Sequence, residues 1–169
     1  MLTIASPQAD LILAKKVFYD NDRIWAVNPE IHNLVAYHSS QAIEKLLKLF
    51  VKEKNEELYE TVSRTHNISE ILIKLEFCRC GFVDRHKDIA LNSDVITRMN
   101  RLRYGDGQIS RDECYTVLTM AKNLCCEYLR EHKYETKDSG YDMGEEDRPP
   151  QYHFRDVGRM MNDMGELGR

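Results

Sequence analysis

Anion-binding and proton-transferring side chains occur within one helical apolar pattern in the first third of the chain. On a helical wheel of about 100° per residue, an imidazole lies in the middle of the apolar face, and an amide and two ammonium groups lie along its flank. Ammonium groups neutralise phosphate charge, while amide and imidazole groups form hydrogen bonds. We therefore expect a groove between helices that accepts a nucleotide or another phosphate-bearing ligand. The four residues are His38, Gln41, Lys45 and Lys48.

The same residues also have a structural interpretation, which periodicity alone favours. His38 would be a core histidine bonded to a neighbouring helix, and the stems of the two lysines would cover the edge of the core. Glu44 and Lys48 form an i, i+4 pair that stabilises any exposed helix. Leu47 lies on the opposite side of this helix, which indicates burial on more than one face or a contact between copies.

Two later stretches add groups of the same kinds. His66 stands in Thr-His-Asn-Ile at the predicted start of a helix, and Arg103-Tyr104 stands before a Gly-Asp-Gly break. Each has a structural alternative: Asn67 or its neighbours cap the helix, the arginine favours a helix C-terminus, and Tyr104 packs with its hydroxyl outward. Taken singly these residues fit structural roles, whereas the whole set favours ligand binding.

The elements that must position these residues are helices. Capping signals at Ser6-Pro7, Asn28-Pro29, Asn67 to Glu70 and Ser110 to Glu113 each precede apolar residues at helical spacing. The predicted later helices are 68–77, a run around 95–102 and 110–130, and no stretch alternates as a strand does. The sequence predicts an all-α protein, an up-and-down bundle of four to five helices.

Composition places this bundle in a cytoplasmic protein with an acidic tail. No apolar run is long enough for a membrane span, and we see no secretory signal. The formal net charge is −4, with acids and bases balanced before residue 131. We expect a bundle over 1–131 and a flexible tail over 132–169 that contains Gly residues and Met160, Met161 and Met164. The five cysteines lack zinc spacing and are predicted to be reduced thiols; we expect no metal and no cofactor.

Three motifs in order resemble a known family. They are H-x-x-Q-x-x-E-K-x-x-K over 38–48, T-H-N-I over 65–68 and R-Y-G-D over 103–106. Together they resemble the HEPN family, the helical domains named for nucleotide binding in higher eukaryotes and prokaryotes, over roughly residues 8–130. The resemblance implies a bundle that is usually dimeric and that helps a nucleotidyltransferase partner to bind its nucleotide or substrate. It would place His38, Gln41, Lys45, Lys48, His66, Arg103 and Tyr104 around the ligand.

The resemblance also implies two alternatives. Other members are metal-independent ribonucleases or toxins with an R-x4-6-H motif, but no histidine follows Arg103 at that spacing. If the chain cleaves RNA, the candidate catalytic pairs are Arg103 with His66, or Arg79 with His86, which match R-x6-H formally around a Gly81 break. The last alternative is a plain dimeric interaction bundle without a ligand.

Overall fold

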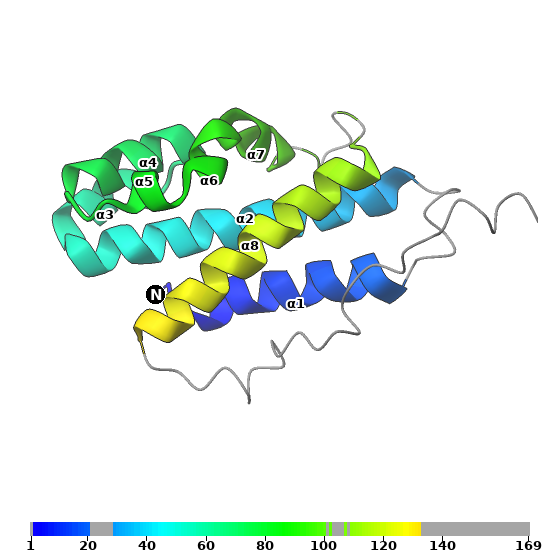
Figure 1. The fold of residues 1–169 in the computed structure, drawn as a ribbon, viewed down its shortest axis with the longest axis horizontal. Helices are drawn as coiled ribbons and strands as arrows, with labels where there is room; N and C mark the ends of the chain where they lie inside the picture. The colour runs from blue at the N-terminus through cyan, green and yellow to red at the C-terminus, as the bar shows by residue number, and fades with distance from the viewer. Residues whose placement is uncertain (1, 21–28, 101, 103–106, 108, 133–169) are drawn as a thin grey trace, which may run out of the picture. The chain divides into compact units, whose positions relative to one another are not determined.

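The computed structural model describes residues 2–20, 29–100, 102, 107 and 109–132 (Figure 1). These residues belong to one compact unit, and all their regular structure is helical, which confirms the all-α prediction. The predicted tail, apart from His132, lies outside the described residues, as do Arg103, Tyr104 and Asn28. The helices are α1 (Ala5–Asp20), α2 (Pro29–Lys54), α3 (Glu56–Val62), α4 (Ile68–Phe77), α5 (Phe82–Arg85), α6 (Lys87–Leu91), α7 (Ser93–Met99) and α8 (Arg111–Glu131).

The central element is α2. It packs against α1, α8, α3, α4 and α7, and Figure 1 shows it between α1 and the group α3–α7, with α8 crossing it. Because neighbours surround it, apolar side chains are buried on opposite sides of the helix, Leu47 and Leu49 among them. The predicted burial of α2 on more than one face is therefore confirmed within a single chain.

Capping chemistry fixes two helix starts close to their predicted positions. Asn67 accepts hydrogen bonds from the backbone of Ser69 and Glu70 at the start of α4. Ser110 and Glu113 form the reciprocal capping box at the start of α8. The prediction of Ser6 as an N-cap is wrong, because α1 begins at Ala5 and Ser6 lies in its first turn. Boundaries of this kind shift by one or two residues because helix ends fray.

Three short helices are absent from the sequence prediction. Each of α3, α5 and α6 has seven or fewer residues, which is too short to show a clear helical period. The break predicted at Gly81 is present, with Gly81 at φ 61° and Arg79 at φ 50°. After the break, Phe82 is buried with its ring centroid 5.1 Å from that of Phe50, so α5 is held by packing with α2.

The beginnings of α2 and α8 are tied together by polar contacts. His32 Nδ1 lies 2.8 Å from the carbonyl oxygen of Ile109, and Asn33 Nδ2 donates to Gly107 O at 2.8 Å. The thiol of Cys114 lies 3.2 Å from His32 O, and burial raises its pKa to about 12, so it stays protonated at neutral pH. These bonds anchor the approach to α8 beside α2. All five cysteines are free thiols.

The α8 capping box gives a first prediction. Ser110→Ala removes the side-chain acceptor for Glu113 N, so the free energy of unfolding should fall by about 1 kcal/mol. Urea unfolding monitored by circular dichroism measures this loss. Asn123→Ala, at an exposed position of the same helix, is the control and should not destabilise. Equal unfolding midpoints for Ser110→Ala and the wild type would show that the cap contributes nothing.

Candidate functional site

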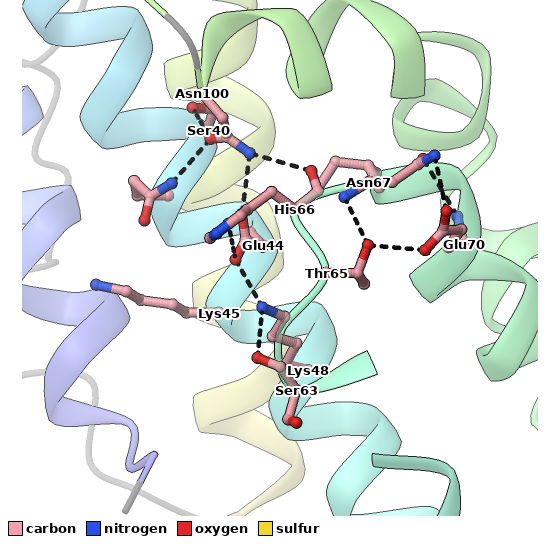
Figure 2. Close-up of polar contacts among 12 residues, drawn as sticks. Ser40, Glu44, Lys45, Lys48, Ser63, Thr65, His66, Asn67, Glu70 and Asn100 are labelled. Atoms are coloured by element: carbon pink, nitrogen blue, oxygen red, sulfur yellow. Dashed lines mark hydrogen bonds and ion pairs between the residues drawn. The ribbon is translucent and has the colours of Figure 1, made fainter. Parts of the chain in front are cut away.

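A buried carboxylate lies at the centre of the predicted site. Glu44 of α2 has a side-chain exposure of only 3%. Lys48 Nζ donates to Oε1 at 2.7 Å and Asn100 Nδ2 donates to Oε2 at 2.9 Å. His66 Nδ1 lies 3.1 Å from both oxygens, so it carries the proton because a carboxylate only accepts. Figure 2 shows these partners converging on Glu44 from separate parts of the chain.

Lys48 is a buried partner of Glu44. Its side chain is 7% exposed, and its ammonium also donates to Ser63 O at 3.1 Å. Removing two ions from water costs several kcal/mol each, which the pair offsets only through close contact and additional hydrogen bonds. Lys48 therefore supplies a counter-charge to the Glu44 carboxylate and links α2 to the segment after α3.

Asn100 extends the network to two more polar side chains of α2. It is the C-cap of α7, and its Oδ1 accepts from Ser40 Oγ at 2.6 Å and from Gln41 Nε2 at 3.0 Å. The sequence analysis did not include Asn100 or Ser40 among the site residues. An asparagine directly after the last apolar residue of a helix is a recognisable cap signal, but the signal does not reveal the partners of its side chain.

A second network joins α2 to α1. Asp10 lies 3.1 Å from His38 Nδ1 and 2.6 Å from Lys45 Nζ. The side-chain exposures are 15% for Asp10, 16% for His38 and 28% for Lys45. His38 is thus bonded to a neighbouring helix, which is the arrangement that the structural interpretation expects. Asp10 was absent from the predicted site residues.

The structure brings five of the seven predicted ligand-binding residues into these two networks. The networks are adjacent along α2, because Glu44 centres one and Lys45 belongs to the other. The residues within the Glu44 network differ in access: the His66 side chain is 71% exposed, whereas that of Lys48 is 7% exposed. Arg103 and Tyr104 follow Asn100 by three and four positions and lie outside the described residues. The five are His38, Gln41, Lys45, Lys48 and His66.

The alternative pair, Arg79 and His86, has a different setting. His86 is buried, its ring centroid is 4.3 Å from that of Phe82, and its Nε2 lies 2.8 Å from Glu127 Oε2 on α8. Arg79 is exposed just after α4 and lines a surface hollow with Ile73. Among the contacts of the described residues, none joins Arg79 to His86.

The residues that the structure describes contain neither a metal-binding cluster nor a helix suited to a membrane. Within these ranges, no three His, Cys, Asp or Glu side chains gather closely enough to hold a metal ion. None of the helices in this part of the chain is both long and apolar enough to cross a membrane.

Burial of the Glu44–Lys48 pair predicts a large cost for removing one partner. Lys48→Met leaves the Glu44 carboxylate without its main counter-charge, so the unfolding free energy should fall by about 3–5 kcal/mol. Lys52→Met is the control, because Lys52 pairs with Glu56, whose side chain is 62% exposed. Loss of this pair should change the free energy of unfolding by less than about 1 kcal/mol.

A double-mutant cycle separates this coupling from lost packing. Glu44→Leu with Lys48→Met should lose clearly less stability than the sum of the two single variants, as measured by urea unfolding. Additive losses would contradict a direct interaction between the two buried charges.

The Asp10 network predicts a pH dependence of stability. Burial raises the pKa of the Asp10 carboxyl, but hydrogen bonds and charges from His38 and Lys45 outweigh burial, so its pKa lies below the usual range. A lowered pKa stabilises the folded state above about pH 4, and this contribution is lost as the pH falls through the folded pKa. The stability difference between wild type and Asp10→Asn should therefore be largest near neutral pH and shrink below about pH 4.

Urea unfolding of both proteins across this pH range measures the difference. The comparison isolates Asp10 from Glu113, whose pKa is also lowered, by hydrogen bonds from Ser110. A difference that stays constant down to pH 2 would contradict the assigned contacts.

Comparison with known proteins does not identify a family or a function for this chain. No protein-family model, no curated protein and no solved structure matches this chain significantly. The HEPN resemblance therefore stays a prediction from three motifs, and the function must be argued from the residues themselves.

Proposed function

We propose that this chain is a non-catalytic, HEPN-like module that binds a nucleotide or another phosphate-bearing ligand and acts with a nucleotidyltransferase partner. The supporting observation is that two accessible groups, the His66 imidazole and the Lys45 ammonium, are each held by a carboxylate of low exposure, Glu44 and Asp10 respectively. His66 contacts Glu44, and Lys45 is the next residue of α2 (Figure 2). Groups of these two kinds recognise phosphate oxygens.

Accessibility separates the roles of the two lysines. The Lys45–Asp10 pair is more accessible than the Lys48–Glu44 pair, with side-chain exposures of 28% and 15% against 7% and 3%, so a phosphate can replace Asp10 at a smaller cost. The Lys48–Glu44 pair is buried, and separating it costs several kcal/mol. We therefore propose that Lys45 contacts phosphate and that Lys48 acts as a positioning residue through Glu44.

The remaining roles follow from side-chain chemistry. With its Nδ1–H directed at Glu44, the neutral His66 ring presents Nε2 as an acceptor for a hydroxyl or amino group of a ligand, and Gln41 carries an amide in the same network. His38 keeps Asp10 close to Lys45. Arg103 would meet a second phosphate oxygen and Tyr104 would stack on a base, as the family resemblance implies. Two carboxylates balance two ammonium groups here, so Arg103 would supply the excess positive charge that attracts an anion.

One contact favours metal-independent RNA cleavage as a second candidate function. A carboxylate bonded to Nδ1 of an exposed histidine fixes the tautomer and the orientation of the imidazole and leaves Nε2 free to accept a proton, as general base catalysis requires. His66 would take the proton of a ribose 2′-hydroxyl, and Arg103 would neutralise the phosphate. The third candidate, a dimeric interaction bundle, predicts no binding of nucleotide or RNA.

Calorimetric titration of the purified chain with ATP, GTP and a short RNA, in the presence of EDTA, tests the proposal. We expect saturable binding of at least one ligand. Lys45→Ala should weaken that binding at least about tenfold, because it removes the accessible cation. The matched control Lys87→Ala, an exposed lysine at the start of α6, should leave the affinity unchanged.

The same samples separate the rival functions. RNA shortening in EDTA that His66→Ala abolishes would replace the binding proposal with the ribonuclease. Absence of heat with all three ligands would refute both and leave the interaction bundle. Equal weakening by Lys45→Ala and Lys87→Ala would contradict the proposed site, since it would indicate general attraction between charges.

A further inference from the structure

The Lys45 ammonium, which the proposed site offers to a phosphate, already holds an anion. One oxygen of the Asp10 carboxylate lies 2.6 Å from Lys45 Nζ, and the other lies 3.1 Å from His38 Nδ1. Figure 2 shows the Lys45 side chain extending from α2 toward α1, the helix that carries Asp10. A ligand phosphate therefore reaches this ammonium only in competition with a carboxylate of the same chain.

The competing carboxylate is charged and held in place. Burial raises the pKa of Asp10, but hydrogen bonds and charges from His38 and Lys45 outweigh burial, so the group is ionised at neutral pH. The two contacts fix both carboxylate oxygens, and the Asp10 side chain is only 15% exposed. Because Asp10 belongs to the same chain as Lys45, it competes at a high effective concentration, whatever the concentration of the ligand.

We infer that Asp10 is a built-in competitor of the phosphate ligand and that α1 responds when the ligand replaces it. This inference rests on the proposed function and assigns a regulator to the same site. When a phosphate oxygen takes the Lys45 ammonium, Asp10 keeps its contact with His38 and loses its counter-charge. The free energy of separating Asp10 from Lys45 is subtracted from that of ligand binding. By linkage, removal of the competing charge tightens binding by the same factor.

The response of α1 is local. Leu11, Ala14 and Phe18 are buried, and α1 packs against both α2 and α8, so apolar contacts keep the helix in the bundle when the ion pair opens. Loss of the contact between Asp10 and Lys45 lowers the free energy of local opening around Asp10. Ligand binding should therefore lower amide protection in this part of α1 without releasing the helix.

Asp10→Asn tests the competition, because it keeps the shape of the side chain and removes its charge. The full chain is titrated calorimetrically with ATP, GTP and the short RNA at neutral pH. For the ligand that the wild type binds, the affinity of the variant should rise at least about tenfold. The same variant should be less stable than the wild type, since a lowered pKa of Asp10 stabilises the folded state at this pH. A structural defect alone would weaken binding, so tighter binding by a less stable protein identifies competition.

Two controls separate competition from a general change of charge. In a Lys45→Ala background, Asp10→Asn should raise the affinity less than about threefold, because the contested ammonium is absent. Asp84→Asn, which removes an exposed carboxylate on α5, should leave the affinity unchanged. These titrations use 0.15 M salt, at which exposed charges more than about 8 Å apart are largely screened. Equal gains with and without Lys45 would indicate general repulsion and overturn the competitor.

Hydrogen exchange measures the response of α1. In the wild type, the amides of residues 10–14 should exchange faster when the ligand is saturating. In Asp10→Asn they should exchange faster already without the ligand and should not change further when it binds. Amides in the middle of α8 serve as the reference and should not respond. Unchanged exchange of residues 10–14 in the saturated wild type would contradict the assigned response.

The outcomes distinguish this inference from the proposed function. If the wild type binds a ligand and Asp10→Asn binds it equally or more weakly, the competitor is overturned and the proposed function stands. If the wild type binds none of the three ligands, the proposed function is refuted, and the competitor with it.

Discussion

A charged carboxylate inside a helical bundle must be surrounded by hydrogen-bond donors, and this requirement determines the polar contacts around Glu44. Glu44 is buried on the central helix, where an unpaired charge would cost many kcal/mol. Its donors come from one turn further along α2, from the segment before α4 and from the end of α7. The need to compensate a single charge therefore joins three parts of the chain that are far apart in sequence.

This constraint explains the polar pattern on α2. All five specified residues of the H-x-x-Q-x-x-E-K-x-x-K motif have intramolecular partners with short contacts: His38 and Lys45 share Asp10, Gln41 meets Asn100, and Lys48 meets Glu44. A motif of this kind can therefore reflect the demands of folding as well as those of a ligand. In the proposed site, the groups that are both held and accessible are His66 and, to a smaller degree, Lys45.

Local signals predicted much of the fold, because helices are local structures. The apolar period and the capping residues placed α4 and α8 within a residue or two of their observed bounds. The short helices around Gly81 were missed, because tertiary packing of Phe82 rather than local propensity stabilises them. The candidate site was predictable as a set of residues but not as a set of contacts. Asp10 and Asn100 lie 35 and 56 positions from their partners Lys45 and Glu44, and no periodicity reveals such pairs.

Hydrogen exchange of Glu44→Gln measures the central claim most directly, because the substitution keeps the shape of the side chain and removes its charge. If Glu44 links α2 to α4 and α7 through His66 and Asn100, amide protection should fall selectively at the start of α4 and the end of α7. Amides in the middle of α1 and α8 should keep their protection. Unchanged protection throughout, or an equal loss in every helix, would contradict the role assigned to this carboxylate.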